Sequence, residues 1–321
     1  MKFIAELCQN HNGNFDTVKK LIDKAAESGA THVKIQHIYC KNLVYRPQFE
    51  EGLIKSGKVK AIKRPFDAEY KRLKKLELNS EECTKFVDYA EECGLIPMTT
   101  CFARGGIQSI IEQGFKVIKV ASYDCASYQL IRELINSFDE IFVSTGATFD
   151  SEIEYTNNLL IENNKNYHLL HCITQYPTPL EMMNLNRLKW LKSIANKVGF
   201  SDHSLVSRDG MIAAKAAIFC GAEVIERHFT ISSPEDTKDG PVSINPHHVV
   251  DLFNFSKLSK ADQEEYLNNK LGDWAIMLGK SKRMISSEEL LNRDYYRGRF
   301  ATPRFNGVHD ASSMIFNWEE A

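Results

Sequence analysis

The sequence predicts a (β/α)8 barrel, and two observations carry that prediction. Short β-rich runs recur along the chain, and apolar residues follow helical spacing in the segments between them. Most intervals fit one strand and one helix, the repeat of a βα unit. The eight runs are 3–7, 32–36, 95–100, 117–120, 141–144, 168–171, 197–200 and 224–228.

Glycines mark the predicted ends of several helices. Each follows a helical segment and stands just before a strand, where a left-handed residue commonly ends a helix. The glycines are Gly29, Gly94, Gly114 and Gly221. The structural rival is a doubly wound open sheet, which would favour a glycine-rich phosphate turn after the first strand. The turn at 8–13 reads Cys-Gln-Asn-His-Asn-Gly, with one glycine, so the barrel is favoured.

Two segments depart from the repeat. A stretch from about 37 to 79, rich in Lys, Glu and Tyr, reads as an insertion after the second strand. Beyond Gly240 we expect helices over 246–259 and 260–270, and then a polar tail from Arg283. The chain therefore divides into a barrel domain, 1–282, and a short C-terminal extension, 283–321.

The composition excludes several classes of protein. Lys plus Arg is 40, Asp plus Glu is 42, and 43% of residues are hydrophobic, so neither disorder nor nucleic-acid binding is expected. No apolar run is long enough to span a membrane. The N-terminus lacks a signal-peptide core, and the eight cysteines form no CxxC pair. We therefore expect a cytoplasmic protein with reduced thiols.

Polar and ionisable residues gather where the predicted strands end, which is where barrel enzymes carry their chemistry. Taken singly, a strand lysine is usually solvated and a serine at a strand end is usually a turn residue. The recurrence at all eight strands favours a site, because buried Lys and Glu need partners or ligands. An anionic ligand and a metal would meet that need. The candidates are Glu6, Lys34, Gln36, Thr100, Lys119, Ser122, Asp124, Ser144, Thr174, Tyr176, Ser201 and Glu226.

Two histidines stand at the ends of adjacent predicted strands. His203 and His228 would lie within reach of one ion, and two imidazoles suit Zn, Mn, Co or Fe. The neighbouring carboxylates of Asp202 and Glu226 favour a harder ion such as Mn²⁺ or Mg²⁺.

These segments together resemble the sialic acid synthase family, the nonulosonate synthases. The matching segments run in order from residue 3 to about 241. They are Glu6 with Asn10-His11-Asn12-Gly13, then 33–36, 99–102, 118–122, 143–146, 170–172 with Tyr176-Pro177-Thr178-Pro179, 199–203 and 225–230.

The resemblance implies a metal-dependent barrel that condenses phosphoenolpyruvate with a six-carbon amino sugar of the N-acetylmannosamine type. The product would be a nine-carbon 3-deoxy-2-keto acid of the sialic, legionaminic or pseudaminic type. The metal would be Mn²⁺, with Mg²⁺ or Co²⁺ as alternatives, and the protein would be a homo-oligomer. By resemblance, His203 and His228 bind the metal, and Glu6 or Glu226 handles protons. Phosphoenolpyruvate would be held by Lys34, Thr100, Lys119, Ser122, Ser144 and Ser201, and the sugar would face Glu6, Gln36, Tyr176 and Asp239.

The chain departs from the family pattern on the sugar side. Thr174, Asp124, Cys101 and Val242 stand where Asn or Ser, Glu, Pro and Asp are usual. Residues 292–301 resemble the family's linker, but the residues after it are too few for the usual antifreeze-like domain. Its contact with the sugar could fall to Arg297, Arg299 or Arg304.

Two alternatives stay open. The same chemistry could act on another aldose or on an aldose phosphate, for which the insertion at 46–75 could supply cations. A barrel without catalysis, serving as a binding or regulatory subunit, is the alternative of a different class.

Overall fold

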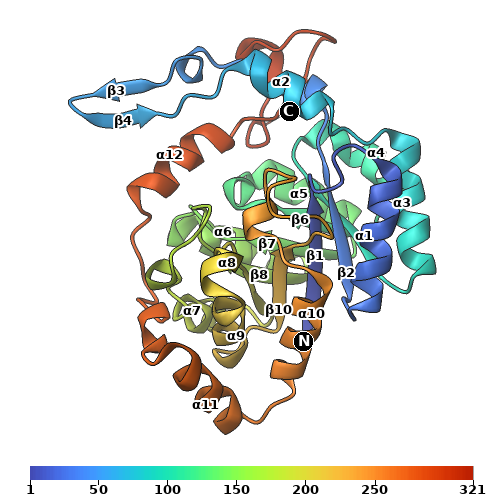
Figure 1. Cartoon of the computed structure of the whole chain (residues 1–321). Helices are drawn as coiled ribbons and strands as arrows, with labels where there is room; N and C mark the ends of the chain where they lie inside the picture. Colours follow the sequence, from blue (N-terminus) through green and yellow to red (C-terminus); the bar gives the residue numbers. More distant parts are fainter. Residues whose placement is uncertain (321) are drawn as a thin grey trace.

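A computed structural model describes residues 1–320 and contains a closed barrel of eight strands, which confirms the predicted (β/α)8 fold (Figure 1). The strand order around the barrel is β1-β10-β9-β8-β7-β6-β5-β2, and each neighbouring pair is parallel. Each predicted run coincides with one strand. The strands are β1 Lys2–Cys8, β2 His32–His37, β5 Ile96–Cys101, β6 Val117–Val120, β7 Glu140–Ser144, β8 Asn166–Cys172, β9 Val198–Ser201 and β10 Val224–His228.

Helices surround the barrel and bury their apolar faces against the outward side chains of the strands. The four glycines expected to end helices all have positive φ. The expected helix over 246–259 ends at Ser256, because the Ser259 side chain caps the next helix by accepting from the Asp262 amide. The helices are α1 Phe15–Glu27, α3 Ser80–Glu92, α4 Ile107–Glu112, α5 Tyr128–Ser137, α6 Asp150–Glu162, α7 Arg187–Ile194, α8 Val206–Asp209, α9 Ile212–Phe219, α10 Pro246–Ser256 and α11 Lys260–Leu271.

The inside of the barrel is built in layers, because residues two apart on a strand point the same way. One layer is apolar: Ile4, Met98, Val117, Phe142, Leu170 and Val224 form a single buried cluster. Two residues further along the same strands come Glu6, Thr100, Lys119, Ser144, Cys172 and Glu226. The apolar layer thus lies directly beneath the polar residues at the strand ends.

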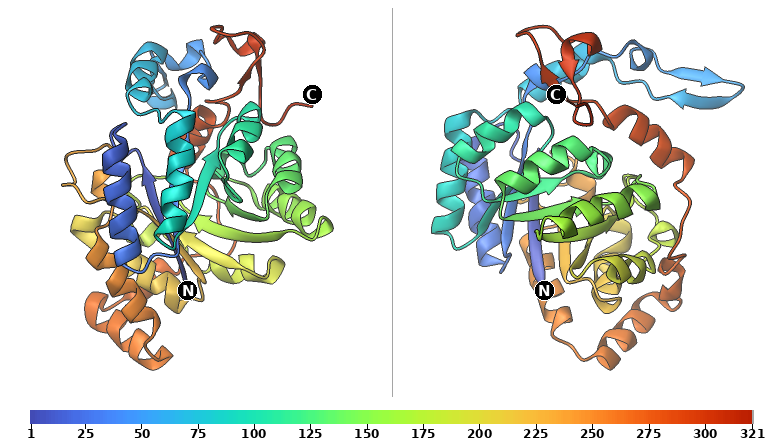
Figure 2. Two further views of the ribbon diagram at one scale, coloured as in Figure 1. Left: turned by 90° about the vertical axis from the view of Figure 1, so that its right-hand side faces the viewer. Right: turned by 180° about the vertical axis from the view of Figure 1, so that it is seen from behind.

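The insertion after β2 lies above this end of the barrel. It contains the hairpin β3 Leu53–Lys55 and β4 Lys58–Ala61, followed by α2 Phe66–Lys74. Figures 1 and 2 show the hairpin extending away from the barrel. The barrel resumes with α3, whose N-terminus is capped by Asn79, where the insertion was expected to end.

The C-terminal tail folds over the same end of the barrel. It contains α12 Ser287–Tyr296 and a small ribbon of β11 Thr302–Pro303 with β12 Met314–Ile315. The tail meets the insertion through bridges that pair Leu43 with Phe300 and Tyr45 with Asp310. It meets the barrel where Asn317 Nδ2 donates to Asp124 Oδ1 at 3.0 Å. The tail is therefore docked on the barrel, and the domain boundary at 282 stays a prediction.

Among residues 1–320, the helices are all too short or too polar to cross a membrane.

Replacing Phe142 with alanine tests the contribution of the apolar layer to stability. Phe142 is fully buried and its ring stacks on His168 with a centroid distance of 4.3 Å. We expect Phe142→Ala to lower the free energy of unfolding by about 3–5 kcal/mol, because the cavity left behind cannot fully collapse. Urea unfolding followed by circular dichroism would measure this. Ile54→Ala on the exposed hairpin is the control, and an equal effect of the two variants would contradict the assignment.

Candidate functional site

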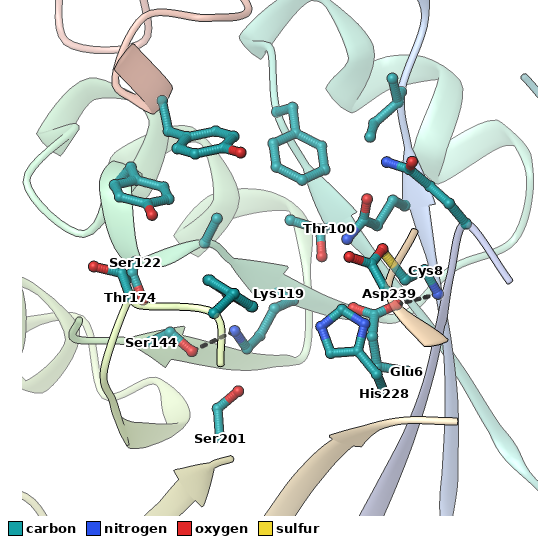
Figure 3. A pocket seen from close by; sticks show the side chains of 18 of the residues that line it. Glu6, Cys8, Thr100, Lys119, Ser122, Ser144, Thr174, Ser201, His228 and Asp239 are labelled. Atoms are coloured by element: carbon teal, nitrogen blue, oxygen red, sulfur yellow. Dashed lines mark hydrogen bonds between the residues drawn. The ribbon is translucent and has the colours of Figure 1, made fainter. Parts of the chain in front are cut away.

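A cavity of about 400 Å³ opens at the carboxyl ends of the barrel strands. The catalytic, substrate-binding and metal-binding candidates all line it, although their roles stay predictions, whereas Asp202, Arg297 and Arg304 do not. Figure 3 shows the group of Glu6, Cys8, His228 and Asp239 on one side and Ser122, Ser144 and Thr174 on the other. The full expected set is Glu6, Lys34, Gln36, Thr100, Lys119, Ser122, Asp124, Ser144, Thr174, Tyr176, Ser201, His203, Glu226, His228 and Asp239.

Two lysines and two carboxylates form a buried ion cluster at the bottom of this cavity. Lys34 Nζ lies 2.5 Å from Glu6 Oε2 and 3.0 Å from Glu226 Oε2. Lys119 Nζ lies 3.5 Å from Glu226 Oε1 and 2.6 Å from Ser144 Oγ. The lysines are therefore neither outward-facing nor solvated, in contrast to the usual position of a strand lysine.

The cluster determines the charge of its members. Burial favours the neutral carboxyl, but the ammonium groups of Lys119 and Lys34 hold the pKa of Glu226 well below its usual range. Burial likewise opposes the charge on Lys34, yet Glu226 and Glu6 raise its pKa. At Lys119 burial prevails and lowers the pKa, with a smaller lowering from the Lys34 charge. Glu226 and Lys34 are thus ionised at neutral pH. Of the two lysines, Lys119 gives up its proton more readily.

Hydroxyl groups line the wall beside Lys119. Ser122 Oγ accepts from the Gly146 amide at 3.1 Å, and Ser201 Oγ donates to Glu226 Oε1 at 2.8 Å. A Cβ at Gly146, the second residue after β7, would lie 2.6 Å from Thr174 Cγ2 and 3.0 Å from the Cys172 carbonyl oxygen, so glycine at this position lets these strand ends approach each other. This wall offers several hydrogen-bond donors to an anionic ligand.

The two histidines lie together at the adjacent strand ends, as the sequence predicts. Their ring centroids are 5.6 Å apart. His203 Nδ1 contacts the Ile173 carbonyl at 3.2 Å, which directs its other nitrogen away from the backbone. Burial, with the His228 charge second, lowers the pKa of His203 well below its usual value, so the ring is neutral and can act as a ligand.

A second arrangement of ligand atoms includes His228. One ligand atom each from Cys8, His228 and Asp239 lies within 4.8 Å of the others. Cys8 Sγ donates to Asp239 Oδ2 at 3.0 Å, and burial followed by the Asp239 charge raises the pKa of the thiol well above its usual value. Cys8 is therefore a protonated donor in the metal-free site, and a cation would have to displace this proton for the thiol to act as a ligand. Within residues 1–320, His228 Nδ1 is buried without a hydrogen-bond partner. His228 therefore has a ligand nitrogen free for a divalent cation, with Asp239 within 4.8 Å on one side and the His203 ring centroid 5.6 Å from its own on the other.

Asp202 does not join this group, which corrects one expectation. Its carboxylate contacts the guanidinium of Arg227, and both side chains are fully buried. Arg227 also donates to Ser204 Oγ at 2.9 Å. Because Arg227 alternates with the inward-facing residues of β10, Asp202 is drawn outside the barrel interior. It therefore offers no oxygen to an ion at His203 and His228.

Other lining residues were not expected from the sequence. Of the three tail arginines considered, only Arg299 lines the cavity. Arg297 instead lies over the Trp318 ring, 5.1 Å from its centroid. The linker-like motif at 292–301 was the only signal for Asn292 and Tyr296. Arg64 and Arg72 lie in the segment 46–75 that was considered as a source of cations, although neither was singled out, and no local pattern marked Cys8, Tyr123 or Lys238. The unexpected residues are Cys8, Arg64, Arg72, Tyr123, Lys238, Asn292 and Tyr296.

Comparison with known proteins adds independent information. The NeuB family model matches residues 21–264. An N,N'-diacetyllegionaminic acid synthase of Campylobacter jejuni is 31% identical over 258 residues, covering 77% of this chain and 72% of the relative. A pseudaminic acid synthase of the same species is 27% identical, covering 93% of this chain and 81% of the relative.

The fold is shared with solved structures. The N-acetylneuraminic acid synthetase of Leptospira borgpetersenii superposes with a TM-score of 0.68 at 24% identity, covering 84% of this chain and 92% of the other. The spore coat polysaccharide biosynthesis protein SpsE of Bacillus subtilis gives a TM-score of 0.70 at 24% identity, covering 92% and 77%.

Metal binding distinguishes the two arrangements of ligands. We expect His203→Ala and His228→Ala each to abolish binding of Mn²⁺, measured by electron paramagnetic resonance of the free ion. Cys8→Ala should retain binding if the two histidines hold the ion, because that arrangement does not need the thiol. His247→Ala, at an exposed position on α10, is the control. Loss of binding in Cys8→Ala with retention in His203→Ala would contradict the histidine pair.

Proposed function

Because the chain belongs to the NeuB family, we propose that it condenses phosphoenolpyruvate with the open-chain aldehyde of a six-carbon amino sugar. The products are a nine-carbon 3-deoxy-2-keto sugar acid and inorganic phosphate. The observation that carries the proposal is the buried cluster of Lys34, Lys119, Glu6 and Glu226 beside the histidine pair, His203 and His228. Such an ion cluster at the bottom of the cavity suits a small, highly charged substrate next to a cation site.

Phosphoenolpyruvate brings a carboxylate and a phosphate to this ion cluster. Lys119 and the hydroxyls of Ser144 and Ser122 supply a positive charge and donors for the phosphate. Lys34 keeps its charge through Glu6 and Glu226, so it attracts the substrate without giving up a proton. The apolar layer beneath the cluster excludes water, which strengthens each of these interactions.

The reaction forms one C–C bond and breaks one C–O bond. C3 of phosphoenolpyruvate attacks the aldehyde carbon, the oxygen of a water molecule adds to C2, and the bond from C2 to the phosphate oxygen breaks. A divalent cation at His203 and His228 would supply Lewis-acid polarisation of the aldehyde. The ionised Glu226, which accepts from Ser201 at 2.8 Å, can take the proton lost by water.

Glu6 is the second candidate for proton transfer. Its Oε1 accepts from the Cys8 amide at 2.7 Å and its Oε2 contacts Lys34, so both oxygens are held firmly. This positions Glu6 on the side of the cavity that carries His228 and Asp239 (Figure 3). A homo-oligomeric state and a cytoplasmic location remain predictions.

The proposed reaction is tested by inorganic phosphate release from phosphoenolpyruvate. We expect release only with both an amino sugar and Mn²⁺, and none after treatment with a chelator. Mass spectrometry should show a keto acid three carbons longer than the sugar. Release without any sugar, or full activity after the metal has been removed and its absence verified, would contradict the proposal.

Lys119 offers a test of the phosphate contact. We expect Lys119→Met to lower kcat/KM for phosphoenolpyruvate by about 100-fold or more, since the variant loses a buried cation at the developing charge. Lys215→Met is the matched control. Lys215 is also buried, but it lies outside the barrel, with Nζ 2.8 Å from Asp251 Oδ2. If both variants lose activity equally, Lys119 acts on stability rather than on the substrate.

A further inference from the structure

The outer rim of the cavity carries cations that the chemistry at its floor does not use. They come from three segments far apart in the sequence: the insertion, the loop after β10, and the tail. The side chains are Arg64, Arg72, Lys238 and Arg299. Segments converging from three directions build a single positively charged patch over the open end of the barrel.

Glu69 of α2 positions two of these cations. Arg72 makes two parallel contacts with its carboxylate, Nε to Oε2 at 2.9 Å and Nη2 to Oε1 at 2.8 Å. Arg299 Nη2 contacts the same Oε1. Burial opposes ionisation of Glu69, but the hydrogen bonds from Arg72 and the charges of Arg299 and Lys238 lower its pKa to about 2. Glu69 is therefore an ionised anchor that draws the two guanidinium groups together.

The charge count differs between the rim and the floor. At the floor, two lysines face two carboxylates, so the cluster is balanced. At the rim there are four cations and the carboxylate of Glu69, and Asp239 lies between the rim and His228, so the excess is at least two positive charges. A phosphate monoester carries about −1.5 to −2 charges at neutral pH, which matches that excess.

Unused hydrogen-bond donors at the rim point to the same ligand. Arg299 is 7% exposed, and within residues 1–320 its Nε is buried without a hydrogen-bond partner. Lys238 forms no ion pair with any residue of that range. The buried, unpaired Nε of Arg299 costs free energy that an anion bound at the rim would remove, and Lys238, which is exposed, is free to contact the same anion.

We propose that this rim binds a phosphate monoester carried by the acceptor sugar at the end remote from its aldehyde. The rim is adjacent to the reacting centre, because Lys238 precedes Asp239, whose carboxylate lies with His228. With the aldehyde at the histidines, we place the far end of a six-carbon sugar toward Arg72 and Lys238, which line the same cavity. This inference rests on the proposed function and narrows its acceptor to a hexosamine phosphate.

Equilibrium binding tests the proposal without turnover. Titration calorimetry with Mn²⁺ present would compare N-acetylmannosamine and N-acetylglucosamine with their 6-phosphates. We expect at least one phosphorylated sugar to bind about tenfold or more tightly than its parent. Lys238→Ala should remove most of that difference. Lys55→Ala, on the exposed hairpin, is the control for net charge and should leave the difference intact.

A further variant locates the phosphate. Lys119→Met should preserve the preference for the phosphorylated sugar, since the floor is not its site. The proposal is overturned if no pair shows the preference. It is also overturned if Lys119→Met removes the preference while Lys238→Ala does not. Phosphate release from phosphoenolpyruvate with unphosphorylated sugar alone would overturn the rim site and leave the proposed reaction standing. A preserved preference without release for any sugar would support the rim site and count against the reaction.

Discussion

Four charged side chains buried inside the barrel are the constraint on which the rest of the site depends. Lys34, Lys119, Glu6 and Glu226 could not leave water without one another, because each isolated charge would cost several kcal/mol or more. Paired, they form a rigid floor whose charge is balanced until a ligand arrives. An anionic substrate that binds together with a divalent cation can enter this site without leaving any charge unpaired.

The scaffold around this cluster consists of parts with separate tasks. The barrel strands alternate outward residues that pack on helices with inward residues that form the apolar layer and the polar layer above it. The insertion and the tail then cover the open end and contact each other through Leu43 and Phe300. Asp124 and Thr174 serve both parts, since they line the cavity and also bind Asn317 and Glu289 of the tail.

Much of this could be predicted from the sequence, because strand periodicity fixes which residues share a side. The eight strands and the collection of polar strand ends followed from local patterns. The direction of Asp202 did not, since it depends on the buried Arg227 on a neighbouring strand. Nor did the grouping of Arg72, Lys238 and Arg299, which requires three distant segments to meet around Glu69. Local spacing carries no information on such contacts.

The central claim is that the strand-end cluster binds phosphoenolpyruvate next to a histidine-held cation. Anomalous scattering from crystals grown with Mn²⁺ and phosphoenolpyruvate tests it most directly. The account predicts a manganese peak ligated by His203 and His228, with the substrate's phosphate hydrogen-bonded to Lys119 and Ser144. Manganese bound elsewhere, or a phosphoenolpyruvate molecule whose phosphate lies at Arg72 and Lys238 instead, would contradict it.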